Sequence, residues 1–253
     1  MAGQVDGKIA LITGGGSGIG RAISLALARE GAKVMVSDIV EMGGVETVQL
    51  IKDAGGEASF VKTDVAQEAD VQAMVKHTVT TYGRLDCAFN NAGIEGAFAK
   101  TEKYTKEEWD RVIAINLTSV WLCLKYEIDH MLQLGGGAIV NTASAAGLVG
   151  MRGGPAYVAA KHGVVGLTKT AALEYAKANI RVNAVCPGII NTPMFERGVE
   201  GKPQLVDPLS AVSPTGRLGK PEEIAAAVVW LCSDAASFVT GHPMSIDGGI
   251  VAA

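Results

Sequence analysis

The chain has 253 residues, of which 48% are hydrophobic and 19% are charged, and its formal net charge is −4. This length and apolar content fit a single folded domain over residues 1–253 and argue against a disordered chain. No block of Lys and Arg is present to neutralise phosphates, so neither nucleic acid nor a membrane surface is an expected partner. The first residues lack a basic region followed by an apolar stretch, and we expect a cytoplasmic protein without a secretory signal.

Short apolar runs bounded by turn residues alternate with longer helical patterns along the whole chain, which is typical of βαβ units. Such connections join parallel strands and place helices on both faces of the sheet. We therefore predict an α/β fold with a Rossmann-type, doubly wound sheet of seven parallel strands. The predicted strands are residues 8–13, 33–37, 58–62, 85–89, 138–142, 181–186 and 244–246.

A glycine-rich turn follows the first predicted strand. Residues 13–20 read Thr-Gly-Gly-Gly-Ser-Gly-Ile-Gly and lead into a helix with apolar periodicity. Glycines let the backbone turn sharply beside a pyrophosphate, whose charge is received by the helix N-terminus. The spacing is G-x-x-x-G-x-G and not the generic G-x-G-x-x-G, so a merely tight turn is the alternative. The flanking strand and helix favour a dinucleotide-binding turn.

Asp38 stands at the end of the second predicted strand, twenty residues after Gly18. A carboxylate in this place accepts hydrogen bonds from the adenosine ribose 2′-hydroxyl and repels a 2′-phosphate. Ser17 and Ile39, which flank the same region, are not basic. We therefore predict NAD and not NADP as the cofactor. Residues 64–65 and 90–93 follow the third and fourth strands, at the strand ends where this architecture binds its ligand.

Two long helices are predicted in the second half of the chain. The first is one largely buried helix over residues 107–131, and the second covers residues 155–176. Together they carry more apolar surface than one sheet face can cover, which indicates a homo-oligomer. The apolar positions of the first helix are Trp109, Val112, Ile113, Leu117, Val120, Trp121, Leu124 and Ile128.

Tyr157 and Lys161 are four residues apart in the second of these helices, so they lie on one helix face. A cation beside a phenol favours the phenolate, and we expect Lys161 to lower the pKa of Tyr157 toward values useful for acid/base chemistry. Such a pair alone arises often by chance on an amphipathic helix. It gains significance from the glycine-rich turn and from Ser144, which follows the fifth predicted strand.

Residues 187–221 contain six prolines, and the helical periodicity is broken there. We predict a long irregular segment, which at the carboxyl edge of a parallel sheet is placed to cover a ligand as a substrate lid.

The cysteines and histidines form no pattern of metal ligands, so we predict no catalytic metal. Cys87, Cys123, Cys186 and Cys232 are widely spaced, and we interpret them as buried free thiols.

Four motifs together resemble the short-chain dehydrogenase/reductase family over essentially the whole chain. They are T-G-x-x-x-G-x-G at residues 13–20, N-N-A-G at residues 90–93, Y-x-x-x-K at residues 157–161, and Pro187-Gly188. The resemblance implies an enzyme that transfers a hydride between NAD(H) and a secondary alcohol or ketone. It also implies a homotetramer.

The resemblance further implies a catalytic tetrad of Asn116, Ser144, Tyr157 and Lys161. In the family, the tyrosine exchanges a proton with the substrate hydroxyl, and the serine holds the substrate oxygen. The lysine binds the nicotinamide ribose, and the asparagine anchors a water that links the lysine to solvent.

Binding residues also carry over from the family, position by position. Those implied for the cofactor are Gly14, Ser17, Gly18, Ile19, Gly20, Asp38, Ile39, Asp64, Val65, Asn91, Ala92, Gly93, Tyr157, Lys161, Pro187, Gly188, Ile190 and Thr192. Those expected for the substrate are Ser144, Ala146, Tyr157, Ile189, Met194 and Phe195.

The expected substrate pocket is mostly apolar or small, which suits an apolar or alicyclic alcohol or ketone. Residues 141–150, 161–168 and 233–241 are similar to bacterial family members that act on cyclic alcohols and diols. Glu95 and Arg152 are the charged candidates near the pocket, and we interpret both as solvated rim. The alternatives are a ketoacyl-carrier reductase, which would normally use NADPH, and a non-catalytic dinucleotide-binding regulator.

Overall fold

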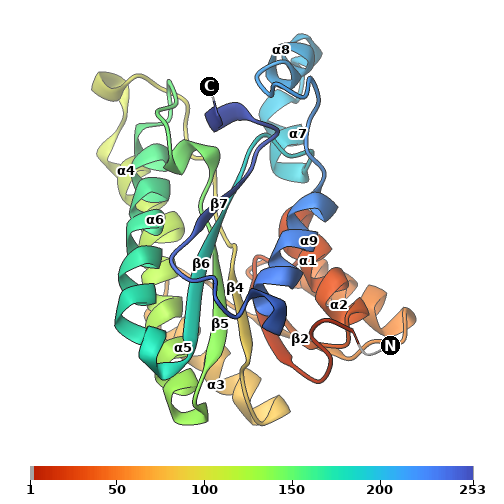
Figure 1. Ribbon diagram of the computed structural model, residues 1–253. Helices are drawn as coiled ribbons and strands as arrows, with labels where there is room; N and C mark the ends of the chain where they lie inside the picture. The colour runs from red at the N-terminus through yellow and green to blue at the C-terminus, as the bar shows by residue number, and fades with distance from the viewer. Residues whose placement is uncertain (1–2, 253) are drawn as a thin grey trace.

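The computed structural model describes residues 3–252 and contains a sheet of seven parallel strands in the order β3-β2-β1-β4-β5-β6-β7 (Figure 1). The predicted fold is confirmed, and each predicted strand is found to within two residues at either end. The strands are β1 (Ile9–Thr13), β2 (Lys33–Asp38), β3 (Ala58–Lys62), β4 (Cys87–Asn90), β5 (Gly137–Thr142), β6 (Ile180–Pro187) and β7 (Pro243–Ile246).

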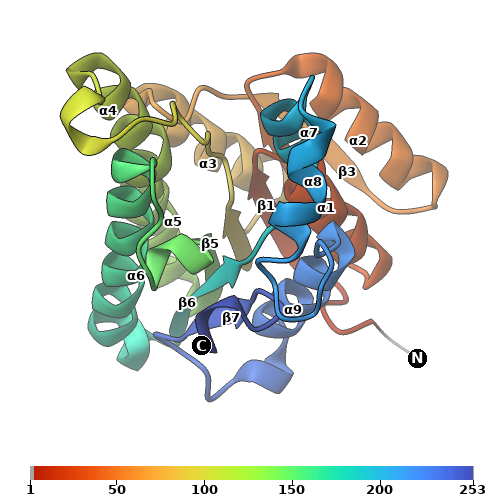
Figure 2. The ribbon, with the colours of Figure 1, turned by 90° about the horizontal axis from the view of Figure 1, so that it is seen from above.

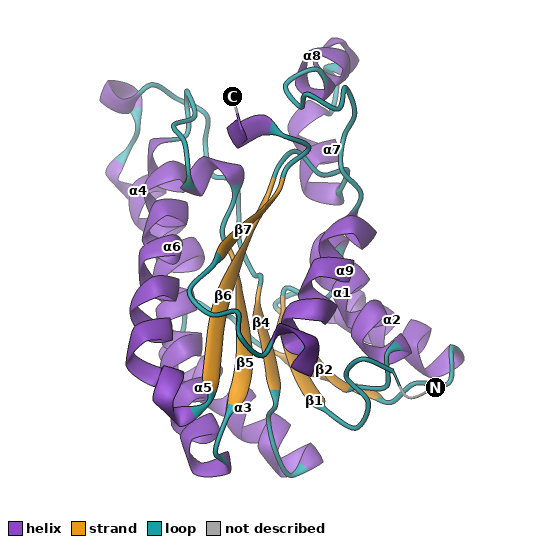
Figure 3. Ribbon diagram, in the orientation of Figure 1, coloured by secondary structure: helices purple, strands orange, loops and turns teal. Residues whose placement is uncertain are grey.

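Helices cover both faces of the sheet, as Figures 1 and 3 show. One layer contains α1 (Gly18–Arg29), α2 (Glu41–Asp53) and α9 (Pro221–Cys232). The other contains α3 (Glu68–Tyr82), α4 (Lys106–Ile113), α5 (Ser119–Leu134) and α6 (Pro155–Tyr175). In the view from above, the strands run between these two layers (Figure 2).

The core consists of two apolar clusters, one on each face of the sheet. Leu11 of β1 packs in the cluster under α3 and α5 with Met74 and Met131, whereas its neighbour Ile12 packs with Ile23 and Leu27 of α1. Successive side chains of a strand point to opposite faces, so a strand covered by helices on both sides must be apolar throughout. This explains the continuous apolar runs of the sequence.

The helix predicted over residues 107–131 consists of α4, a π-helical turn over Ala114–Thr118, and α5. Its position was predicted correctly, but the expectation that it is largely buried is wrong for Trp109 and Trp121, which are 36% and 47% exposed. Val120 and Leu124 face the sheet and are buried. Trp121 is rotated away from this stripe because successive helical residues point about 100° apart.

The expectation of an irregular segment over residues 187–221 is wrong, because α7 (Pro193–Val199) and α8 (Val206–Ser210) form within it. Pro193 begins α7, since the fixed φ of proline suits the first residue of a helix. The segment is closed at its base, where Gly219 N donates to Ile189 O at 2.9 Å and Asn191 N donates to Gly219 O at 2.9 Å. Figure 1 shows α7 and α8 above the carboxyl edge of the sheet.

A buried chain of polar side chains joins α5, β4, β5 and α6 beneath this edge. Asn90 Nδ2 donates to Glu127 Oε2 and to Asn141 Oδ1, both at 3.0 Å, and Asn141 Nδ2 donates to Thr168 Oγ1 at 3.0 Å. Glu127 is fully buried, and the loss of its hydration raises its pKa from 4.5 to about 7. The fold therefore holds this carboxyl in its protonated form at mildly acid pH.

We expect Glu127→Gln to flatten the pH dependence of stability. Because the folded-state pKa is raised, the unfolded chain releases this proton first as the pH rises from 4.5 to about 7, and the folded state loses stability over that window. Between pH 5 and pH 8 the wild type should lose roughly 2 kcal/mol relative to the variant, which stays neutral. Urea unfolding at both pH values measures this difference, with Glu107→Gln on the exposed side of α4 as the control. If the free energies of unfolding of variant and wild type differed by the same amount at both pH values, Glu127 would not be protonated in the folded protein.

Candidate active site

The glycine-rich turn between β1 and α1 has a conformation and a packing that require glycine. Gly14 and Gly18 have φ angles of +64° and +50°, and a Cβ on Gly20 would clash with the Gly14 carbonyl oxygen. A Cβ on Gly18 would stand 3.4 Å from Thr192, so the segment over residues 187–221 approaches the turn here. The turn thus leaves a cradle at the N-terminus of α1, where the first backbone N–H groups lack helical partners and can receive a pyrophosphate.

The end of β4 fixes this turn from the side. Thr13 Oγ1 accepts hydrogen bonds from Asn91 N at 2.9 Å and from Ala92 N at 3.1 Å. In return, Asn91 Nδ2 donates to Thr13 O at 3.1 Å and to Gly14 O at 3.2 Å. The order of the strands reverses between β1 and β4, which is the point where doubly wound sheets bind ligands.

Asp38 stands at the end of β2 and faces the same turn. Its Oδ2 accepts from Gly16 N at 2.9 Å, and its Oδ1 accepts from Val40 N at 2.8 Å. Ile39 beside it is 57% exposed. A neighbouring cation, Arg21, is engaged by Gly16 O, by Thr47 Oγ1 and by the Glu46 carboxylate, with Nη2 2.6 Å from Glu46 Oε2.

Two cofactor candidates lie at the end of β3. Asp64 Oδ1 accepts from Ala66 N at 3.0 Å in a turn, and Val65 is buried. Both residues stand at the carboxyl edge of the sheet but outside the pocket described next.

A pocket of about 350 Å³ opens at the carboxyl edge of the sheet and brings most of the predicted site together. Of the tetrad, Ser144, Tyr157 and Lys161 line it. Every expected substrate residue also lines it, including Ala146, Ile189, Met194 and Phe195, and so do the cofactor candidates Ile19, Asn91, Gly93, Pro187, Gly188, Ile190 and Thr192.

Ser144 and Tyr157 face each other in this pocket. Ser144 follows β5 and begins a short 3-10 turn, in which its Oγ accepts from Ala146 N at 3.1 Å. Tyr157 lies in the first turn of α6. Burial raises the pKa of Tyr157, the Ser144 hydroxyl acts in the opposite direction, and the negative charge of Glu95 raises the pKa further.

Lys161 lies one turn farther along α6. Its Nζ donates to Thr142 O at 2.7 Å and is 5.6 Å from the centre of the Tyr157 ring, and burial lowers the pKa of this lysine to about 8. The expectation that Lys161 lowers the pKa of Tyr157 is therefore wrong for this arrangement. The ammonium is directed at a backbone carbonyl, and the desolvation of the phenol outweighs the groups that favour the phenolate.

Asn116 lies in the π-helical turn between α4 and α5 and is fully buried. Its Oδ1 accepts from Ile94 N at 2.8 Å, and its Nδ2 donates to Ile94 O at 2.7 Å. The side chain thus holds the loop that follows β4, and single π-helical turns are frequent at functional sites. Its role as a water anchor stays a prediction.

Several residues that line the pocket were missed in the sequence. Ile94 and Phe98 follow the N-N-A-G motif closely, and Val212 belongs to the lid, so their place in the chain could have suggested them. Ile250 gave no such signal; Figure 1 shows the C-terminal segment at the same edge of the sheet as α7 and α8. Glu95, interpreted as solvated rim, is half-buried and lines the pocket, so it is less solvated than that interpretation expects.

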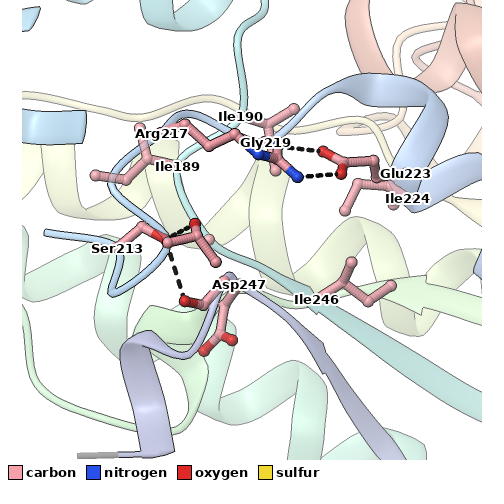
Figure 4. A pocket seen from close by; sticks show the side chains of 12 residues that line it. Ile189, Ile190, Ser213, Arg217, Gly219, Glu223, Ile224, Ile246 and Asp247 are labelled. Atoms are coloured by element: carbon pink, nitrogen blue, oxygen red, sulfur yellow. Dashed lines mark hydrogen bonds and ion pairs between the residues drawn. The ribbon is translucent and has the colours of Figure 1, made fainter. Parts of the chain in front are cut away.

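A second, smaller cavity of about 100 Å³ lies where the segment over residues 187–221 returns to the sheet (Figure 4). Its polar groups are paired within the protein. Arg217 and Glu223 form a bidentate ion pair with N–O distances of 2.6 and 2.9 Å, and Ser213 Oγ lies 2.7 Å from Thr215 Oγ1. The Asp247 carboxylate accepts two backbone N–H groups at 2.9 and 3.0 Å. We interpret this cavity as part of the base of the segment over residues 187–221.

All four cysteines are buried free thiols, as predicted. Within residues 3–252, no group of three or more His, Cys, Asp or Glu side chains is arranged to hold a metal ion. In the same part of the chain, no helix is long and apolar enough to cross a membrane.

Comparisons with known proteins agree with this geometry. The model of a family described as enoyl-(acyl carrier protein) reductase matches residues 14–251. The cyclohexanol dehydrogenase of Acinetobacter sp. (strain SE19) is 48% identical over 98% of this chain and 96% of its own length. The 2,5-dichloro-2,5-cyclohexadiene-1,4-diol dehydrogenase of Sphingobium indicum is 47% identical over 98% of this chain and 99% of its own. The crystal structure of levodione reductase is similar with a TM-score of 0.95 and 42% identity, covering 98% of this chain and 99% of that one.

Proposed function

Because the chain belongs to the short-chain dehydrogenase/reductase family, we propose that it oxidises alicyclic secondary alcohols, or reduces the corresponding ketones, with NAD(H). The observation that carries this proposal is the meeting of Ser144, Tyr157 and Lys161 in one mainly apolar pocket. Two relatives named above act on six-membered rings, and a pocket of about 350 Å³ has room for such a ring. The lid, with Met194 and Phe195 in its wall, would exclude water from the reacting carbon.

The cofactor fits the cradle formed by the glycine turn, the Asn91 segment and Thr192. When bound there, a nicotinamide dinucleotide accepts or supplies the hydride. Ser144 would hold the substrate oxygen and stabilise its developing charge. Tyr157 would take the hydroxyl proton during oxidation and return it during reduction. Lys161, which is held by Thr142 O, would bind the nicotinamide ribose.

Two alternative functions make different demands on the site. A ketoacyl-carrier reductase would normally use NADPH, whereas Asp38 is an acid and Arg21 is already paired with Glu46. A non-catalytic regulator would not need the tetrad, yet all four of its residue types are present. An assay with NAD, NADP, secondary alcohols and a β-ketoacyl thioester separates the three functions.

NAD preference is expected to depend on Asp38. A carboxylate bonded to the ribose 2′-hydroxyl and the repulsion of a 2′-phosphate should together contribute about 2 to 4 kcal/mol, or roughly 30-fold to 1,000-fold in kcat/KM. Asp38→Ala should lower the ratio of kcat/KM with NAD to kcat/KM with NADP. Asp38→Asn, which removes only the charge, should lower this ratio less. Steady-state kinetics with both cofactors measure the ratio, and equal or better use of NADP by the wild type would reject the prediction.

Tyr157→Phe should lower kcat by about 100-fold or more and leave the affinity for NAD nearly unchanged, because only the proton-transfer group is lost. Tyr126→Phe, which removes a hydroxyl that donates to Glu68 and does not line the pocket, is the control. Because burial raises the pKa of Tyr157, alcohol oxidation by the wild type should speed up as the pH rises toward that value, while ketone reduction should not. Wild-type turnover in Tyr157→Phe, or a flat oxidation profile from pH 6 to 10, would contradict the role.

We also propose a homotetramer. Trp121, Leu132 and Leu173 leave apolar surface on the outer sides of α5 and α6, with Leu173 85% exposed. Sedimentation should give a species of four times the 26.1 kDa chain mass, and Leu173→Glu should yield smaller species. Leu50→Glu, an exposed leucine of α2 on the opposite layer, is the matched control. A wild-type species of a single chain mass at micromolar concentration would remove the proposal.

A further inference from the structure

Glu95 is the one acidic side chain that lines the pocket in the described part of the chain. It lies in the loop after β4 and is half-buried. No hydrogen bond or ion pair to its carboxylate forms within residues 3–252. A carboxylate that loses part of its hydration without gaining a partner is costly, and a ligand that brings a hydrogen-bond donor would offset this cost.

The carboxylate of Glu95 lies beside α7. A Cβ built on Gly198 of α7 would lie 3.4 Å from Glu95 Oε2 and 3.9 Å from Oε1, which are ordinary van der Waals distances, so α7 approaches this carboxylate closely. Burial raises the pKa of Glu95, and the charge of Arg197 lowers it by less. Arg197 is neither within ion-pair distance of Glu95 nor part of the pocket lining among the described residues. The carboxylate therefore remains open to a molecule in the pocket.

The pocket lining contains two charged groups of opposite sign, Lys161 and Glu95. The cation Lys161 donates to Thr142 O and belongs, with Ser144 and Tyr157, to the reacting end. Glu95 is the other charged group in the lining. Most of the wall beyond the reacting end is apolar, and it includes Ile94, Phe98, Val149, Met151, Met194 and Phe195. An apolar ring in this pocket would meet a proton acceptor at Glu95.

We propose that Glu95 determines substrate specificity by accepting a hydrogen bond from a second hydroxyl group on the substrate ring. This proposal rests on the proposed oxidation of alicyclic alcohols. The hydrogen bond to Glu95 would make cyclic diols better substrates than simple cyclic alcohols. A ring that carries a carboxylate in place of the second hydroxyl would be repelled by Glu95.

The test compares kcat/KM for cyclohexanol with that for the cis and trans cyclohexanediols, in the wild type, Glu95→Ala and Glu95→Gln. In the wild type the best diol should exceed cyclohexanol by roughly 10-fold to 100-fold, the range expected for a hydrogen bond to a charged group. Glu95→Ala should lower this ratio to the statistical factor that arises because a diol offers a second hydroxyl for oxidation. Glu95→Gln should give a ratio between those of Glu95→Ala and the wild type. The ratio cancels any effect of the Glu95 charge on Tyr157, because both alcohols react through the same phenol.

A hydroxycyclohexanecarboxylate tests the charge separately. Glu95→Gln should raise kcat/KM for this anion while it lowers kcat/KM for the diol, and a merely structural role would move both in one direction. Glu196→Ala, which removes an exposed carboxylate on α7, should change neither the diol-to-cyclohexanol ratio nor kcat/KM for the anion. Equal diol-to-cyclohexanol ratios in the wild type and in Glu95→Ala would overturn the proposal for Glu95. The proposed function would still stand if the wild type turned over cyclohexanol. If the wild type turned over no alcohol, both the proposal for Glu95 and the proposed function would be wrong.

Discussion

The reversal of strand order between β1 and β4 is the constraint on which the site depends. Strands on either side of this point are connected in opposite directions, so their carboxyl ends open a crevice that no crossover helix covers. The Thr13 hydroxyl joins the two ends by accepting two backbone N–H groups from the residues after β4. The glycine turn and the N-N-A-G segment are therefore one structural unit. Ser144 after β5 and Tyr157 on α6 reach the same crevice because their elements are added to the sheet in sequence on that side.

Polar groups beneath the crevice hold these ends in place. Asn90, Glu127, Asn141 and Thr168 link two strands to the two helices that pack on them. Asn116 adds a second link, from the π-helical turn to Ile94. Each of these side chains bonds to another element, although Asn90 Oδ1 and Glu127 Oε1 have no partner among the described residues. Hydrogen bonds of this kind favour one arrangement of the elements that they join. Two of the elements that they join, β5 and α6, position Ser144 and Tyr157, the side chains that we propose to react with the substrate.

Much of this arrangement could be predicted from the sequence because its causes are local. Apolar runs buried on both faces define the seven strands, and the glycine pattern defines the turn that only glycine can form. The resemblance to the family supplied the tetrad, of which Ser144, Tyr157 and Lys161 meet in the pocket.

The features that the sequence did not predict depend on contacts between distant segments. Among residues 187–221, which contain six prolines, α7 forms because Pro193 occupies its first helical position. The direction of the Lys161 amine is set by the Thr142 carbonyl of another element. Glu95 could not be distinguished from a solvated rim residue until α7 was seen to lie against it.

We propose that a ring alcohol gives its hydride at this pocket to the nicotinamide of NAD. Cyclohexanol deuterated at the carbinol carbon, incubated with the protein and NAD, tests it directly by mass spectrometry of the reduced dinucleotide. We expect NADH that is one mass unit heavier than NADH formed from unlabelled cyclohexanol. NADH of ordinary mass, or no NADH at all with any alicyclic alcohol, would contradict the account.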